Sequence, residues 1–106
     1  NITSTGKGTV VGWGIPDYDS GVSISTSVGG TFTVPIDCCI FGRAGANSRV
    51  GIYKDNSSGA SLLYLESTGS DTATDHVFVA KGTNVYVGYR NGTYTSLMYF
   101  PLKGAN

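Results

Sequence analysis

The sequence predicts an all-β domain, a sandwich or barrel of about eight or nine short antiparallel strands with no significant helix. Three observations predict it. The 106 residues include 12 Thr, 12 Ser, 16 Gly and seven Tyr, whereas good helix formers are scarce. No window repeats apolar residues at the helical spacing i, i+3, i+4 and i+7. Runs of about four to eight β-forming residues, bounded by turn residues, recur about every ten residues.

The predicted strands follow one another along the chain, and turn-forming segments separate them. The clearest such segments are residues 45–47, 55–59 and 81–83, which are rich in Gly, Asn, Asp and Ser. Pro35 ends a strand, because proline cannot donate to a central ladder. The resulting strands cover residues 9–14, 22–25, 31–34, 38–44, 49–54, 62–67, 76–80, 84–89 and 95–100.

The strongest turn signal is Asn91-Gly92, between the last two predicted strands. A type I′ hairpin turn needs positive φ at both central residues, and Asn-Gly meets that need well. We therefore expect residues 84–89 and 95–100 to pair as a hairpin.

The tip of this hairpin is the predicted ligand-binding site. It combines two aromatic rings with a cation and an amide, in Tyr89, Arg90, Asn91 and Tyr94. Sugars have flat C–H faces that pack on aromatic rings, and their hydroxyl groups pair with Asn, Asp and Arg. The alternative is that Tyr89 and Tyr94 form a cross-strand pair that stabilises the hairpin, while Arg90 stays in solvent.

Several strands carry apolar residues on both faces. Ile40 and Phe41 point to opposite faces of one predicted strand, as Leu97 and Met98 do in another. A solitary sandwich buries one face of each strand and predicts clean alternation of apolar and polar residues. The second faces are covered either by loops of the same chain or by identical subunits. The loops are short, so we favour subunits and predict a homo-oligomer.

The two cysteines, Cys38 and Cys39, are adjacent in the sequence. Consecutive Cα atoms are about 3.8 Å apart, whereas a relaxed disulfide needs about 4.4 to 6.8 Å. Neighbouring strand residues also point to opposite faces. We interpret both cysteines as small, apolar, unpaired side chains.

Charge and motif content argue against several function classes. Seven basic and seven acidic residues give zero net charge, so no basic surface is expected for nucleic acid. No apolar stretch approaches the length that spans a bilayer, so no membrane insertion is expected. His76 and Glu66 are the only His and Glu, and no nucleophile elbow occurs, so we expect no enzyme.

No metal or cofactor is expected either. Asp17 and Asp19 alternate as in one corner of a calcium loop, but the remaining ligands and the closing Glu are missing. Turn chemistry explains these two residues.

Four segments together resemble a known family. They are residues 13–24, 32–35, 79–85 and 99–104, and the most telling combination pairs an opening Pro-Asp-Tyr-x-x-Gly-Val with a closing Phe-Pro-Leu-Lys-Gly. These segments resemble the small β-sandwich tip domains that end tail fibres and receptor-binding proteins of bacteriophages. The likeness spans about residues 11–104.

The resemblance implies a jelly-roll-like antiparallel β-sandwich head over residues 9–104, with residues 1–8 as a flexible lead-in or the end of an upstream fibre stalk. It implies a homotrimer in the virion, at the tail-fibre tip, that binds a bacterial cell-surface saccharide or protein. A chain that starts at Asn1 rather than Met fits a piece of a longer protein, and unpaired cysteines fit assembly in a reducing cytoplasm.

The expected function is therefore non-enzymatic host recognition through several weak contacts at once. One alternative is a carbohydrate-binding module or adhesin domain of a bacterial secreted or surface protein. Another is a purely structural trimerisation or capping domain.

Overall fold

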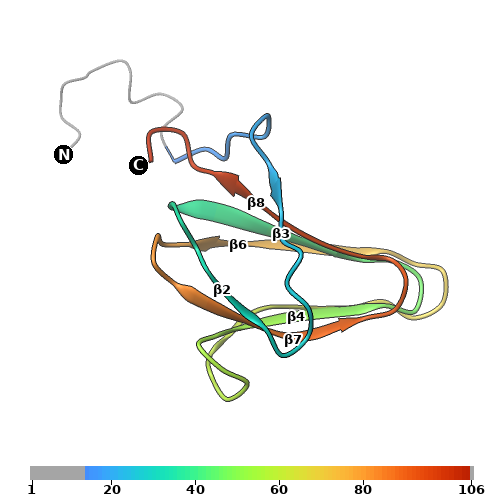
Figure 1. Cartoon of the computed structure of the whole chain (residues 1–106). Coiled ribbons are helices and arrows are strands. Elements are labelled where there is room, and N and C mark those ends of the chain that lie inside the picture. Colours follow the sequence, from blue (N-terminus) through green and yellow to red (C-terminus); the bar gives the residue numbers. More distant parts are fainter. Residues whose placement is uncertain (1–13, 106) are drawn as a thin grey trace.

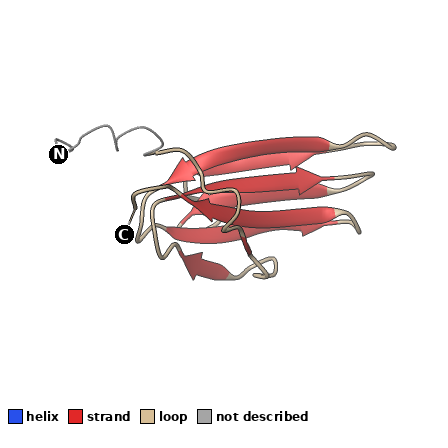
Figure 2. Cartoon of the chain, turned by 90° about the horizontal axis from the view of Figure 1, so that it is seen from above, coloured by secondary structure: helices blue, strands red, loops and turns tan. Residues whose placement is uncertain are grey.

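The computed structural model describes residues 14–105, and these residues form strands and loops without a helix (Figures 1 and 2). The strands are β1 (Val22–Ser23), β2 (Thr31–Thr33), β3 (Cys38–Ala44), β4 (Arg49–Lys54), β5 (Ser61–Glu66), β6 (Ala73–Val79), β7 (Asn84–Asn91) and β8 (Thr95–Pro101). The all-β prediction is confirmed. The predicted lead-in over residues 1–8 and most of the predicted strand 9–14 lie outside the described residues.

The eight strands form two antiparallel sheets of four, in the orders β1-β8-β3-β6 and β2-β7-β4-β5. Consecutive strands alternate between the sheets, except for β4 and β5, which form a hairpin within one sheet. Two packed four-stranded sheets connected in this way make a jelly roll. The predicted jelly-roll-like sandwich is confirmed, and Figure 1 shows the two layers.

The predicted hairpin at Asn91-Gly92 is wrong. Strand β7 pairs with β2 and β4, whereas β8 pairs with β1 and β3 in the other sheet. Gly92 has a φ of 97°, but Asn91 has no positive φ, so the turn is not type I′. A glycine with positive φ also fits a loop that crosses from one sheet to the other. The Asn-Gly pair alone therefore does not distinguish a hairpin turn from such a crossing.

Strand β6 begins three residues before its predicted start. Ala73, Thr74 and Asp75 show no apolar pattern, yet they pair with the last three residues of β3, so that β6 pairs with β3 along its full length. Tertiary pairing here overrides weak local propensity.

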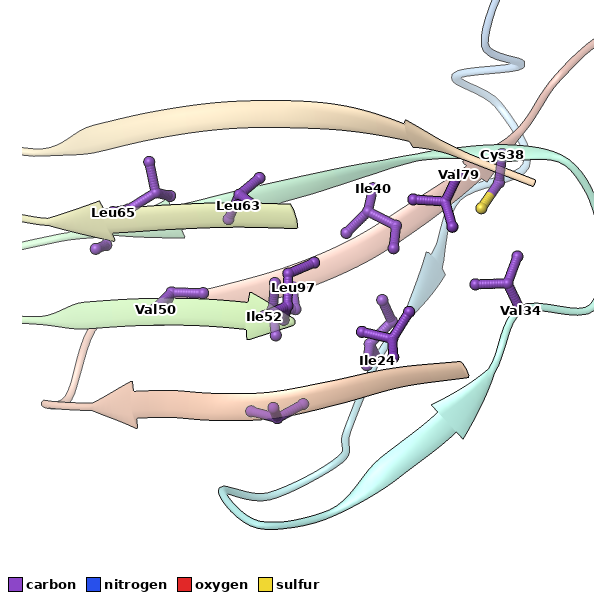
Figure 3. Close-up of a cluster of buried hydrophobic side chains, with 13 residues drawn as sticks. Ile24, Val34, Cys38, Ile40, Val50, Ile52, Leu63, Leu65, Val79 and Leu97 are labelled. Carbon is purple, nitrogen blue, oxygen red and sulfur yellow. The ribbon is translucent and has the colours of Figure 1, made fainter. Parts of the chain in front are cut away.

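The core lies between the two sheets (Figure 3). Alternate residues of β4 and β5 point inward, such as Val50, Ile52, Leu63 and Leu65, and they pack against the inner residues of the other sheet. Each fully buried Val, Leu or Ile side chain contributes about 1.5 to 3 kcal/mol. The other core members are Ile24, Val34, Cys38, Ile40, Ala44, Val79, Val85, Val87 and Leu97.

Both cysteines are free, as predicted, and the structure buries both completely. Cys38 belongs to the core. Cys39 points to the outer face, where its cross-strand neighbours are Phe78 and Phe100.

A segment of the same chain covers part of the doubly apolar strands, as in the first of the two alternatives above. This segment, residues 17–21, lies over part of the outer face of β3 and β8. The ring of Tyr18 is 6.0 Å from that of Phe41 and 5.2 Å from that of Phe100. Phe78 on β6 is outside this cover and stays 58% exposed. The homotrimer stays a prediction.

Three crossings between the sheets lie together at one end of the sandwich, at the right of Figure 1. They are residues 45–48, 67–72 and 92–94. The Gly45 amide donates to the Tyr94 carbonyl at 2.7 Å, and the Ser67 amide donates to the Ser48 carbonyl at 2.9 Å. These bonds join the three crossings into one layer. Within the described part of the chain, no helix is long and apolar enough to span a membrane.

Candidate functional site

The outer face of the β2-β7-β4-β5 sheet carries four tyrosines from three strands, and we refer to it as the tyrosine face. Its members are Tyr53 on β4, Tyr64 on β5, and Tyr86 and Tyr89 on β7. Three of them follow from strand alternation, because Ile52, Leu63, Val85 and their inward neighbours occupy the other face.

Tyr89 joins this face because of a β-bulge. Val85 and Val87 point inward, so simple alternation would turn Tyr89 inward as well. The register between β4 and β7 shifts, however: Ile52 lies opposite Val87, and Gly51 lies opposite Tyr89. The extra residue, Gly88, therefore sends Tyr89 to the outer face.

Two glycines let the tyrosine rings lie close to the backbone. A Cβ on Gly51 would lie 2.8 Å from Cδ2 of Tyr89, and a Cβ on Gly88 would lie 2.6 Å from Cε1 of Tyr53. The rings of Tyr64 and Tyr89 are 5.7 Å apart and those of Tyr53 and Tyr89 are 6.4 Å apart. The result is an aromatic floor of mutually tilted rings, with Tyr89 at its centre at 59° to Tyr53 and 81° to Tyr64.

Charged groups stand at one end of this floor. The Cζ atom of Arg49 lies 4.0 Å from the centroid of the Tyr89 ring, a cation–π contact. Nη1 of Arg49 donates to the Tyr64 hydroxyl oxygen at 3.4 Å, and that hydroxyl donates to Oε1 of Glu66 at 3.1 Å. The hydrogen bond to Tyr64 raises the pKa of Arg49. The cation and the carboxylate are thus held in place while both stay in contact with solvent.

Two depressions continue the floor. Beyond Arg49 and Glu66 lies a groove of about 320 Å³, which Asn47, Thr68 and Asn91 also line. At the other end a smaller hollow of about 120 Å³ lies among the tyrosines, Ser57 and Gly88. An aromatic floor beside amide, hydroxyl, guanidinium and carboxylate groups can bind a polyhydroxylated ligand, one face on the rings and its hydroxyls on the polar groups.

The structure separates the four predicted site residues. Tyr89 lies on the tyrosine face, and Asn91 lines the groove beside Arg49. Tyr94 is 63% exposed on the crossing 92–94, where it lines a different depression with Arg43. Because β7 and β8 lie in different sheets, the alternative of a cross-strand Tyr89–Tyr94 pair is wrong.

Arg90 is a structural residue rather than a solvated one. Its Nη1 donates to the carbonyl oxygens of Ile24 at 2.7 Å and Thr26 at 3.0 Å. These bonds tie the segment after β1 to β7. The other half of the alternative, that Arg90 stays in solvent, is therefore also wrong, and Arg90 stands outside the tyrosine face.

Sequence reasoning missed Arg49, Tyr53, Tyr64 and Glu66. They come from strands that are not adjacent to the Asn91-Gly92 turn in sequence, so no local window contains them. A usable signal did exist. Once Val50, Ile52, Leu63 and Leu65 are assigned to the core, the intervening residues share the outer face.

His76 has no part in the tyrosine face. It lies on β6 in the other sheet, and its ring stacks on Phe41 at 5.3 Å. Asp75 accepts from the backbone amide of His76 at 2.7 Å, as expected for a carboxylate that does not orient the imidazole. Among residues 14–105, no three His, Cys, Asp or Glu side chains are grouped as a metal site requires.

Comparison with protein-family models, with curated proteins and with solved structures finds no match for this chain. A jelly-roll sandwich hosts many unrelated functions, so the fold alone selects none. The function therefore has to be argued from the chemistry of the tyrosine face.

Proposed function

We propose that this domain is a non-enzymatic saccharide-recognition domain that forms the receptor-binding tip of a phage tail fibre. The observation that carries the proposal is the tyrosine floor with Arg49 and Glu66 held at its edge. A pyranose ring packs its C–H face on the exposed ring of Tyr64, which stands nearly perpendicular to that of Tyr89. Its hydroxyl groups pair with Arg49, Glu66 and Asn91 across the adjoining groove.

We propose that the domain binds the saccharide without hydrolysing it. Hydrolysis of a glycosidic bond needs two carboxyl groups about 5 to 9.5 Å apart on either side of the bond. Among the described residues, Glu66 supplies the one carboxylate that lines the groove. That arrangement supports recognition rather than hydrolysis.

A shallow site of this kind fits a multivalent mechanism. The site is open, so each contact is weak. Three copies on one head, repeated over several fibres, raise the overall avidity by about 10² to 10⁴ without a tight single site. This is why we propose a homotrimer carried by an upstream stalk, which attaches the virion to a bacterial cell-surface saccharide.

The phage assignment itself has its support in the resemblance of residues 13–24 and 99–104 to tail-fibre tips. In the fold the described part of the first segment, from residue 14, lies beside the second. Pro16 bridges to Leu102, and the Asp17 amide donates to the Pro101 carbonyl at 2.8 Å. The same tyrosine face also supports a carbohydrate-binding module of a bacterial surface protein, which we would expect to work as a monomer.

The proposal is tested by replacing an exposed ring of the floor. Tyr64→Ala removes the ring and the hydroxyl between Arg49 and Glu66, so we expect saccharide affinity to fall about tenfold or more, or 1.4 kcal/mol and upward. Binding is measured on an array of bacterial surface glycans and by adsorption to cells. Tyr64→Phe keeps the ring, so we expect it to lose less.

The matched control is Tyr94→Ala, the same change at an exposed tyrosine outside the tyrosine face. We expect it to bind as the unaltered protein does, and thermal unfolding checks that both variants fold. Two results would overturn the proposal. One is an unaltered protein that retains no glycan and adsorbs to no cell; the other is a Tyr64→Ala variant that binds normally.

A further inference from the structure

The outer face of the β1-β8-β3-β6 sheet is apolar across three strands and the segment before β1. We refer to it as the apolar face. Its rings contact one another: Phe41 is 5.2 Å from Phe100, and His76 is 5.9 Å from Phe78. The members are Tyr18, Phe41, His76, Phe78, Met98 and Phe100.

Much of this face remains open to solvent in the single chain. Phe78 is 58% and Tyr18 is 59% exposed. Between Tyr18, Phe41 and Met98 lies a hollow of about 270 Å³. A contiguous apolar surface with a polar rim marks an interaction site in a small globular domain.

The two ends of the apolar face carry opposite charges. Arg43 stands at the end near the sheet crossings, and its guanidinium makes no hydrogen bond or ion pair with any other residue from 14 to 105. At the other end, the turn 17–20 carries Asp17 and Asp19. The Asp17 carboxylate accepts from the Ser20 hydroxyl at 3.0 Å and from the Asp19 amide at 3.2 Å. The Asp19 carboxylate has no such partner among the described residues.

The strand register sets the separation of these charges. Asp17 bonds to Pro101, which lies opposite Cys38, and Arg43 is five residues further along β3. At about 3.3 Å per residue, the two ends are about 16 Å apart. One surface thus presents an apolar centre, a cation at one end and carboxylates at the other.

We propose that the apolar face is the contact between copies of this chain, with the acidic turn of one copy against Arg43 of another. The cation at one end of the face can pair with the carboxylates at the other end of a second copy. The net charge of the chain is zero, so two copies do not repel each other electrostatically. In the homotrimer proposed above, a closed ring brings the acidic turn of each copy to Arg43 of the next copy. This inference rests on the oligomeric part of the proposed function, and it assigns assembly to the sheet opposite the tyrosine face.

The first test places a charge in the apolar centre. Light scattering and sedimentation give the particle mass over a range of concentrations. We expect the unaltered protein to show a multiple of the one-chain mass, and Phe78→Asp to weaken association at least tenfold, because a carboxylate in a dry interface is costly. The control is Val28→Asp, since Val28 is 50% exposed in the segment between β1 and β2, outside the apolar face. Its mass should not change.

The second test exchanges the charges at the two ends. Arg43→Asp and Asp19→Arg each place like charges together, so each should weaken association, most strongly at low salt. The double variant restores opposite charges and should recover the original mass. Failure of the double variant to recover, with both single variants weakened, would overturn the pairing of Arg43 with the acidic turn.

Failure of this inference is distinguishable from failure of the saccharide site. A protein that stays at the one-chain mass at every concentration, or a Phe78→Asp variant that associates normally, overturns the inference whatever the glycan result. Binding of a soluble, monovalent saccharide is measured in parallel. We expect it to be unchanged in Phe78→Asp and reduced in Tyr64→Ala.

Discussion

Cys38 illustrates how burial decides the chemistry of a single side chain. Its thiol is fully buried, and desolvation together with the neighbouring Cys39 and Asp37 raises its pKa from 9.0 to about 11. Burial also raises the pKa of Cys39. The thiolate is the reactive form, so neither cysteine is poised for nucleophilic or redox chemistry near neutral pH.

This pKa shift predicts a loss of stability at high pH. The folded-state pKa of Cys38 lies above its unfolded value, so its contribution is complete below about pH 9 and is lost as the pH rises towards about 11. Two pKa units correspond to about 3 kcal/mol. Urea unfolding at about pH 8 and about pH 11 should show this loss, and Cys38→Ala should reduce it. An equal loss in both proteins would contradict the prediction.

Arg90 and Arg49 lie on the paired strands β7 and β4, yet their side chains take different roles. Arg90 lies opposite the inward-facing Val50, and its guanidinium reaches backbone carbonyls after β1. Arg49 lies opposite Asn91 and stacks on Tyr89. One arginine therefore secures a loop and the other lines the candidate site, a difference that depends on which face each residue occupies.

At the scale of the elements, the bulge in β7 is what assembles the tyrosine face. It places Tyr89 between Tyr53 and Tyr64, which come from two other strands. Bulges re-aim side chains in this way near functional sites. The adjoining glycines let these rings lie close to the sheet backbone.

The crossings between the sheets yield a prediction at Gly92. Its φ is 97°, and an added Cβ would lie 2.5 Å from Oγ of Ser48, which itself accepts from the Tyr94 amide. Gly92→Ala should therefore lower the free energy of unfolding by about 1 to 3 kcal/mol, through strain and a clash together. Chemical denaturation measures the loss.

Gly69→Ala is the matched control for this crossing. Gly69 also has a positive φ, of 67°, but an added Cβ there meets no atom within 4 Å. The control should cost only about 1 kcal/mol, for backbone strain. Equal losses at the two glycines would show that the contact with Ser48 contributes nothing.

At the scale of the whole molecule, the proposed saccharide binding and the proposed assembly belong to different outer faces. The sheets pack back to back, so the tyrosine face and the apolar face look in opposite directions. Ligand binding and assembly can then vary independently. The proposed head would use one sheet for its neighbours and leave the other free to meet a cell surface.

This division predicts a selective loss of avidity. Phe78→Asp should bind a soluble saccharide as the unaltered protein does, yet dissociate from a densely coated glycan surface far faster, with avidity lower by about 10² or more. Surface plasmon resonance at high and low glycan density makes the comparison. Equal retention at high density would mean that assembly adds nothing to attachment.

Most of the strands were predictable from sequence, because local composition, alternation and turn residues select backbone conformation. The boundaries of β3 and β4 match the prediction, and the free cysteines follow from their adjacency. Of the residues in the candidate site, only Tyr89 and Asn91 were predicted from the sequence. The rest of the tyrosine face comes from strands far from them in sequence.

The partner of each strand depends on packing across the molecule. Asn91-Gly92 looks like a hairpin turn, yet Val85, Val87 and Leu97 are buried from opposite sheets, and this separates β7 from β8. The outward aim of Tyr89 likewise depends on a register shift against β4. Local signals describe the conformation of a segment, whereas burial shared between distant segments chooses its neighbours and therefore the site.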